Sequence, residues 1–218
     1  MSCEHKNIPT EFRYCPYCGM EIKREPTFDD LLAHRVNIGD EVRFKLKDGT
    51  DAAVVVVDKN DYDVRCVMFE GVEDMALYDG RHWLKAGSVN YPDSDAVRRY
   101  ERFERMLPNR LQDSIKLRKI MQVFDDGSVH SEIVALYPLS ACEVFGKNAP
   151  NWALKEAGDE PIVFFTDSAE NRKKYLWYTW LRSPDRSGSY SFCAVYSSGS
   201  ADNDRAYGSY GSAPAFTI

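Results

Sequence analysis

Four residues close to the N-terminus have the types and spacing of a zinc site. Cys3 and His5 form a Cys-x-His pair, and Cys15 and Cys18 form a Cys-x-x-Cys pair followed directly by Gly19. Thiolate sulfur and imidazole nitrogen are preferred ligands of Zn²⁺, and four protein ligands complete its tetrahedral shell. We therefore predict a structural zinc site rather than a catalytic one with an open position, with the ligands Cys3, His5, Cys15 and Cys18.

Two other interpretations of these residues are a redox dithiol and stray thiols in a flexible tail. A thioredoxin-like dithiol would lie between a strand and a helix of a much longer unit, and the segment 1–24 is too short for one. A segment of this size has no core of its own, so a bound metal would supply its folding energy. The segment resembles the short zinc ribbons that bacterial proteins carry at a terminus, and such ribbons serve many roles.

Length and charge restrict the rest of the chain. Its 218 residues are enough for one sizeable core, and a net charge of −6 disfavours a general nucleic-acid binder. The longest apolar run, 52–57, is far shorter than the roughly 20 residues of a membrane helix. The first residues contain no apolar signal segment. We therefore expect a protein without membrane partners, located in the cytoplasm or in a virion assembled there.

Residues 25–218 show the hydrophobic patterns of a mixed α+β domain. Thr27, Ser94 and Ser140 are placed to cap helices, and Pro108 interrupts a helical pattern. Residues 52–57 indicate a strand buried on both faces. The patterns predict helices over 27–35, 94–107, 110–122 and 139–145, and strands over 42–46, 52–57, 64–69, 133–137, 161–165 and 175–181.

The composition changes sharply at residues 183–212, which hold nine Ser, four Tyr and four Gly but no Lys, Glu, Leu, Ile or Met. Tyr offers contact area at low entropy cost, and Ser, Gly and Asn offer adaptable hydrogen bonds, as in antibody combining sites. The zone is therefore predicted to be an exposed ligand-binding surface, with structural loops as the alternative. Trp177, Trp180 and Phe216 are expected to frame it. The predicted contacts are Asp185, Arg186, Tyr190, Tyr196, Asp202, Asn203, Asp204, Arg205, Tyr207 and Tyr210.

Six segments carry a resemblance to a known family. They are Trp180-Leu-Arg-Ser-Pro184, the central Ser198-Gly199, the terminal Ala213-Pro-Ala-Phe216, and upstream Asn37-Ile-Gly-Asp-Glu-Val-Arg-Phe44, Leu107-Pro-Asn-Arg-Leu-Gln-Asp-Ser-Ile115 and Leu136-Tyr-Pro-Leu-Ser-Ala-Cys-Glu-Val-Phe-Gly146. Together they resemble a bacterial and phage domain with a C-type-lectin-like fold, related to that of the formylglycine-generating enzyme. The resemblance covers about residues 36–218, although Ala213 stands where many relatives have Arg. The terminal pattern is also similar to the variable proteins of diversity-generating retroelements.

This resemblance implies a C-type-lectin-like α+β domain, 25–218, preceded by a zinc ribbon, 1–24. It implies a non-catalytic protein that recognises a protein or glycan ligand through a surface that is either diversified or fixed. The ribbon would then attach the domain to a larger assembly such as a phage particle. Calcium could bind at Asp202 and Asp204, although two carboxylates are few for a site of six to eight oxygens.

Two alternative functions receive less support from the residues. A formylglycine-generating-like oxidase needs two neighbouring reactive cysteines, whereas Cys193 stands alone and Cys142 lies in a predicted helix. A nucleic-acid-associated zinc-ribbon protein could use residues 97–119, which hold eight Lys or Arg and three acids. The rest of the chain has 20 basic and 31 acidic residues, which disfavours non-specific DNA binding. A solvated helix with ion pairs along its face explains the same pattern.

Overall fold

A computed structural model describes residues 14–20, 24–72, 94–123, 128–154, 158–186 and 191–218. These residues form short helices and antiparallel sheets, so the predicted α+β class is confirmed. No helix among them is long and apolar enough to cross a bilayer. The sequence Asp125-Asp126-Gly127, which is typical of a turn between strands, lies outside the described residues.

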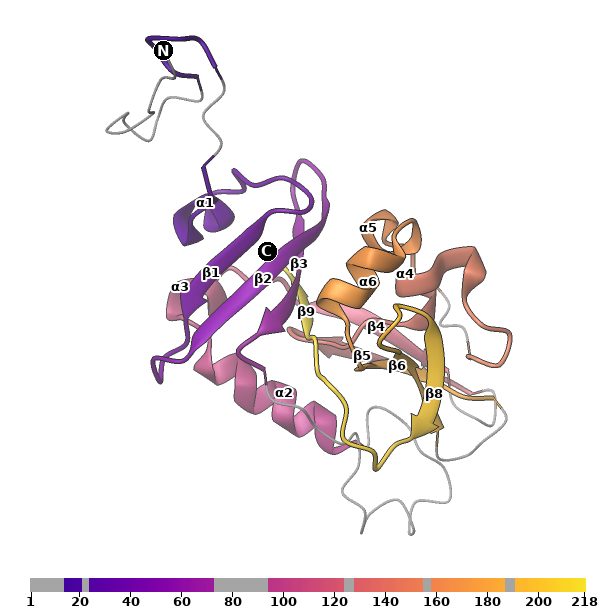
Figure 1. The fold of residues 1–218 in the computed structure, drawn as a ribbon. Coiled ribbons are helices and arrows are strands. Elements are labelled where there is room, and N and C mark those ends of the chain that lie inside the picture. Colours follow the sequence, from indigo (N-terminus) through magenta and orange to yellow (C-terminus); the bar gives the residue numbers. More distant parts are fainter. Residues whose placement is uncertain (1–13, 21–23, 73–93, 124–127, 155–157, 187–190) are drawn as a thin grey trace.

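The central sheet joins the first part of the chain to its last strand. Its strand order is β1-β2-β3-β9, and all neighbours are antiparallel. Cys66 pairs with Phe216, which brings the terminal Ala-Pro-Ala-Phe segment into the core (Figure 1). The four strands are β1 (Glu41–Lys45), β2 (Asp51–Lys59), β3 (Val64–Glu70) and β9 (Ala215–Thr217).

Strand β2 is the most buried element of this sheet. Every side chain from Ala52 to Val57 is buried, although successive residues of a strand point to opposite faces. The sheet is therefore covered on both faces, as the continuous apolar run predicted. On one face, Phe69 of β3 contacts the ring of Tyr175 at a centroid distance of 5.1 Å.

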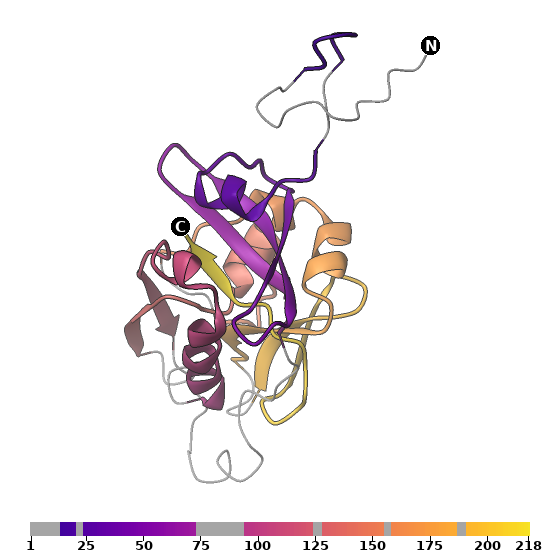
Figure 2. The same cartoon turned by 90° about the vertical axis from the view of Figure 1, so that its left-hand side faces the viewer.

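The first helices follow the predicted capping signals, with one exception. Thr27 caps α1 (Phe28–Leu32) in a reciprocal capping box with Asp30. Ser94 precedes α2 (Asp95–Met106), but its hydroxyl makes no cap hydrogen bond and is buried without a partner in the described structure. Figures 1 and 2 both show α2 on the side of the sheet away from the N-terminal segment.

The helix predicted over 110–122 is wrong for most of its length. Helix α3 ends after one turn (Asn109–Gln112), and the chain then forms β4 (Arg118–Val123), paired with β5 (Val129–Val134). The backbone N–H of Lys116 already donates to Thr217 of the C-terminal strand at 2.8 Å. Pairing with distant segments therefore overrides the local helical pattern.

Two more predicted strands were wrong, at 161–165 and over most of 175–181. The first forms α5 (Val163–Thr166), because a short apolar run does not distinguish a buried strand from a buried helix. The second begins in α6 (Ala169–Tyr175), and its strand starts only at Thr179. The predicted helix α4 (Ala141–Phe145) is confirmed, with Ser140 and Glu143 in a capping box, and the 3₁₀ turn η2 (Gly146–Asn148) follows it.

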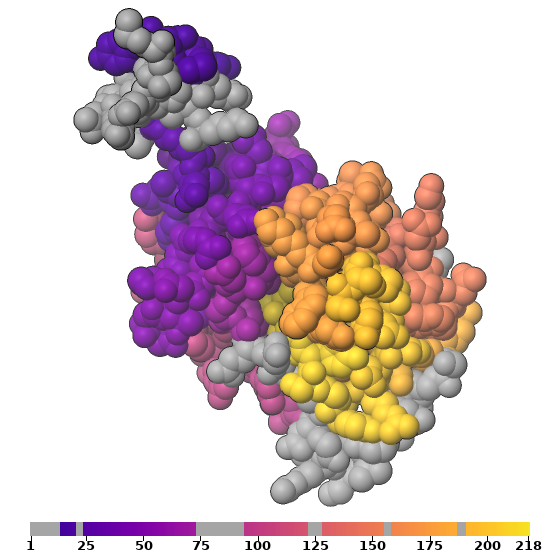
Figure 3. All heavy atoms as spheres, in the orientation of Figure 1, coloured from indigo at the N-terminus to yellow at the C-terminus, as the bar shows by residue number. Residues whose placement is uncertain are grey.

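A three-stranded antiparallel sheet carries the Ser- and Tyr-rich zone, in the order β6-β7-β8. The residues around Phe192 form a strand that is buried on both faces, since Cys193 and Val195 are buried as well as Phe192 and Ala194. Figure 3 shows this C-terminal segment, in yellow, gathered on one face below the helices α5 and α6. Its strands are β6 (Thr179–Pro184), β7 (Ser191–Val195) and β8 (Ala201–Arg205).

Candidate ligand-binding face

A buried ion cluster fixes the position of β6. The guanidinium of Arg182 donates to the Glu143 carboxylate at 2.8 Å and to the carbonyl oxygen of Pro138 at 2.8 Å, and it also contacts the Asp159 carboxylate. Arg182 and Glu143 are fully buried, and Asp159 is almost fully buried. The cluster thus joins two segments that the sequence singled out separately, 136–146 and 180–184.

Two further arginines surround the same carboxylate. Arg118 of β4 lies 3.1 Å from Glu143, and Arg65 of β3 lies 3.6 Å from it. Burial alone would raise the pKa of Glu143, but the guanidinium groups of Arg182 and Arg118 outweigh it and hold the pKa below its ordinary value. Burial raises the pKa of Asp159, against the attraction of Arg182. This cluster connects β3, β4, α4 and β6, and it holds β6 in position.

Aromatic rings form a continuous cluster at the start of β6. The ring of Tyr178 contacts the rings of Trp177 and Tyr196 at centroid distances of 4.9 Å each, and that of Tyr210 at 5.7 Å. Tyr210 also packs on the buried Trp180 at 4.5 Å. Trp177 is 60% exposed and Tyr196 39% exposed, so the cluster runs from the core to the surface.

The backbone of Tyr178 is strained. Its φ is +48°, a left-handed conformation that bulky residues rarely adopt. Its carbonyl oxygen accepts a hydrogen bond from the N–H of Gly211, where an added Cβ would lie 3.0 Å from that oxygen. The close approach therefore favours glycine at 211. Strain of this kind is concentrated at functional sites, where the surrounding structure maintains it.

The polar side chains of β8 continue this surface. Asp202 accepts a hydrogen bond from the N–H of Asn203 at 2.9 Å, and Asp204 accepts one from the N–H of Arg205 at 2.6 Å. The hydroxyl of Tyr210 donates to Asp204 at 2.8 Å, and burial beside this carboxylate raises the pKa of Tyr210. We name these residues the aromatic–acidic face: Trp177, Tyr178, Tyr196, Asp202, Asp204 and Tyr210. The predicted contacts Asn203 and Arg205 alternate with the two aspartates along β8 and so point to its other face, and Arg205 donates to the hydroxyl of Tyr207 at 2.6 Å.

The structure separates the remaining predicted contacts from this face. Asp185 is 2% exposed and binds the side chain of Asn203, so we assign it to supporting β8 rather than to contacting a ligand. Arg186 is exposed, but it follows Pro184, at the end of the sheet opposite the ring cluster. Tyr190 lies outside the described residues.

The expectation for the aromatic frame was partly wrong. Trp180 and Phe216 are buried, as expected, whereas Trp177 is largely exposed. Tyr178, at the centre of the cluster, was missed because it lies before the change in composition at residue 183. The aromatic run Trp177-Tyr178-Thr179-Trp180 could have indicated it, because so many rings in four residues cannot all face a single core.

The described part of the predicted zinc module, residues 14–20, contains a tight turn that closes at Gly19. The N–H of Gly19 donates to the carbonyl oxygen of Cys15 at 2.8 Å, and Gly19 has a φ of +70°, which glycine adopts readily. Cys15 and Cys18 are not in a disulfide. Cys3 and His5 lie outside the described residues, and the rest of the described chain contains no other group of three or more candidate ligands. The calcium site at Asp202 and Asp204 stays a prediction.

The basic segment 97–119 does not form one helix face. Its residues come from α2, α3 and β4, and four of its cations have acidic partners. These pairs are Arg98 with Asp95, Arg110 with Asp29, Lys116 with Asp63, and Arg118 with Glu143. This division of the charge weakens the nucleic-acid alternative.

Comparison with known proteins gives a family for most of the chain. Residues 57–218 match the model of a family described as a domain of unknown function, DUF6273. The chain belongs to the DUF6273 family. No curated protein and no solved structure matches the chain. The matched DUF6273 region contains both the buried ion cluster and the aromatic–acidic face, but it begins inside β2 and so leaves out β1 of the same sheet.

Proposed function

We propose that this DUF6273 protein is a non-catalytic binding protein that recognises a protein or glycan ligand through its aromatic–acidic face. The continuous cluster from the buried Trp180 to the exposed Trp177, with a strained Tyr178 at its centre, carries this proposal. Aromatic rings held by a rigid support bind with little loss of side-chain entropy. The acidic residues of β8 add hydrogen-bonding groups beside them.

A C-type-lectin-like architecture for residues 25–218 is part of the proposal and rests on the sequence resemblance. Two segments of that resemblance meet in the buried pair of Glu143 and Arg182, which supports treating them as parts of one structural motif. The similarity to retroelement variable proteins extends the proposal. Positions on the aromatic–acidic face would then be those that vary between copies of the gene.

Site-specific crosslinking tests the proposed face. A photoreactive benzoyl-phenylalanine at position 196 replaces Tyr196, which is 39% exposed in the ring cluster of the face, and a matched one replaces Tyr62, which is 80% exposed in the β2–β3 turn. We expect a discrete adduct in the producing cells only from position 196. Adding Trp177→Ala should weaken ligand binding by roughly thirtyfold, as for a hot-spot aromatic, and so remove the adduct. Equal adducts from both positions, or none from position 196, would contradict the proposal.

The N-terminal segment 1–24 is proposed to be a zinc ribbon that attaches the domain to a larger assembly. Zn²⁺ supplies the tetrahedral centre that a segment without a core needs to fold. The turn at Cys15 and Cys18 fits that ion, since Gly19 closes it with a hydrogen bond of 2.8 Å. Cys3 and His5 would complete the ligand set.

Metal content tests this ribbon. We expect about one zinc ion per purified chain by plasma mass spectrometry, since four protein ligands bind one ion. The Cys15→Ser/Cys18→Ser variant should lose it, and Cys142→Ser, which changes a half-buried thiol in α4, should keep it. The thermal midpoint of the main domain should not change, because its core lies in other elements. Zinc retained without Cys15 and Cys18 would refute the assignment.

A further inference from the structure

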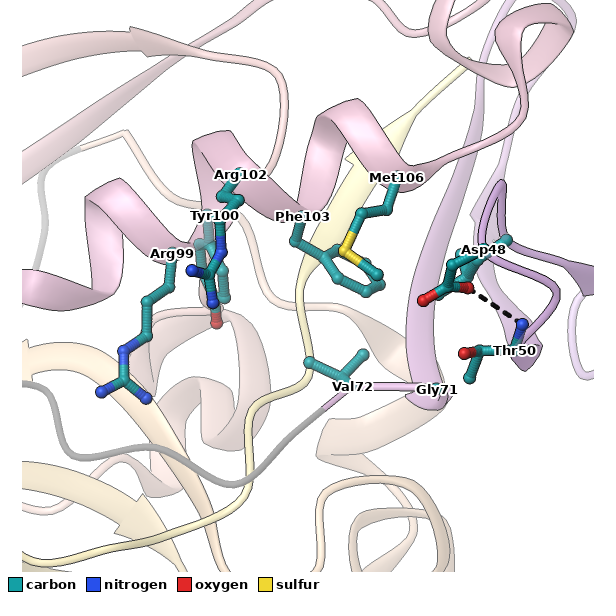
Figure 4. Close-up of a pocket in the computed structure, with 10 residues that line it drawn as sticks. Asp48, Thr50, Gly71, Val72, Arg99, Tyr100, Arg102, Phe103 and Met106 are labelled. Carbon is teal, nitrogen blue, oxygen red and sulfur yellow. Dashed lines mark hydrogen bonds between the residues drawn. The ribbon is translucent and has the colours of Figure 1, made fainter.

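A cavity beside α2 shares no lining residue with the aromatic–acidic face. It has a volume of about 350 Å³ and lies between α2, the β1–β2 turn and the end of β3 (Figure 4). Phe103 and Met106 of α2 and Val72 after β3 supply its apolar lining. Its volume is at the small end of the range for ligand pockets, roughly 300 to 1,000 Å³, which fits a small molecule.

Two arginines line the same cavity. Arg99 and Arg102 are three residues apart on α2, and Figure 4 shows both side chains extending to the same side of the helix. Neither has a hydrogen bond or an ion pair with any residue that the structure describes. Arg98 and Arg110, by contrast, form ion pairs with Asp95 and Asp29.

The acid in the lining does not neutralise these cations. The carboxylate of Asp48 accepts a hydrogen bond from the N–H of Thr50 at 2.9 Å, and this bond holds the pKa of Asp48 below its ordinary value. Figure 4 shows Asp48 at the end of the cavity next to Thr50, with Phe103 and Met106 between it and the arginines. One end of the cavity therefore carries two cations without an acidic partner among the described residues, and the middle is apolar.

We propose that this cavity binds a small amphipathic organic anion, a carboxylate with an apolar body. The guanidinium groups of Arg99 and Arg102 would hold the carboxylate, since planar guanidinium forks match carboxylate oxygens. The apolar body would lie on Phe103 and Met106 and so be removed from water. This site is separate from the aromatic–acidic face and does not depend on the function proposed for that face.

Calorimetric titration of the full chain with octanoate tests the site, with 1-octanol as the uncharged counterpart. We expect saturable octanoate binding that Arg99→Gln/Arg102→Gln weakens by at least about tenfold, since charge-assisted hydrogen bonds are lost. The matched control is Arg98→Gln/Arg105→Gln, which removes the same charge from α2 at residues outside the lining. It should leave octanoate affinity within about twofold of the original, since those residues make no contact with the ligand.

Three results would overturn the proposal. Octanol binding as tightly as octanoate would show that the arginines do not contribute. An equal loss of affinity in both double variants would show attraction to net charge alone. A wild-type chain that gives no saturable binding would show that no such site exists. Far-ultraviolet circular dichroism of each variant establishes that it is folded before its titration is interpreted.

Discussion

The Arg182→Met variant is expected to lose about 3 to 5 kcal/mol of unfolding free energy, as when one partner is removed from a buried ion pair. The guanidinium of Arg182 lies between the carboxylates of Glu143 and Asp159 and is fully buried. Methionine fills much of the same volume but leaves both carboxylates without this partner. Urea unfolding followed by circular dichroism measures the loss.

A surface arginine provides the matched control. Arg43→Met breaks an ion pair with Glu70 in which the side chains are 59% and 41% exposed. We expect a loss below about 1 kcal/mol, because water replaces most of the interaction. If the two substitutions cost the same, the buried cluster is not the support that its geometry indicates.

The stability that Arg182→Met loses should also depend on pH. In the native protein the pKa of Glu143 is lowered, so its contribution to stability is present at neutral pH and is lost as the pH falls through its native pKa. Without Arg182, only Arg118, Arg65 and the Ser140 backbone bond would oppose the effect of burial, so the pKa of Glu143 would rise and Glu143 would bind a proton at a higher pH than in the native protein. The stability deficit of Arg182→Met should therefore be largest at neutral pH and shrink toward about pH 4. A deficit independent of pH would attribute the loss to packing alone.

The Gly199→Ala variant is expected to lose about 3 kcal/mol or more, from a left-handed alanine together with a steric clash. Gly199 has a φ of +79°, and an added Cβ would lie 2.4 Å from the carbonyl oxygen of Ala169 in α6. The carbonyl oxygen of Gly199 also accepts a hydrogen bond from Arg172 at 2.7 Å. The substitution should therefore move the β7–β8 turn, which begins at Tyr196, away from α6.

The Gly49→Ala variant separates the two causes of this loss, the left-handed backbone and the steric clash. Gly49 has a φ of +89° in the β1–β2 turn, and an added Cβ there meets nothing within 4 Å. Gly49→Ala should cost only about 1 to 2 kcal/mol, the conformational penalty alone. Thermal or urea unfolding of both variants gives the comparison. Equal losses would show that the turn yields to the clash and is not held firmly against α6.

The sequence by itself determined the features that depend on neighbouring residues. Thr27 and Ser140 cap their helices because the acidic residue three positions later completes each capping box. The buried strand β2 followed from an unbroken apolar run bounded by turn residues. The composition of the C-terminal zone also indicated where a surface of tyrosines and acids would lie.

The tertiary structure alone decided which distant segments pair and which side chains are exposed. Residues 118–123 form a strand because β5 supplies hydrogen-bonding partners along its length, and the preceding Lys116 pairs with Thr217 of the C-terminal strand; the local helical pattern reveals neither contact. Glu143 and Arg182 are a buried pair, and Tyr178 rather than Asp185 belongs to the aromatic–acidic face, because these contacts join residues far apart in the chain. Local spacing determines how a segment coils or extends, whereas burial depends on what the rest of the chain places against it.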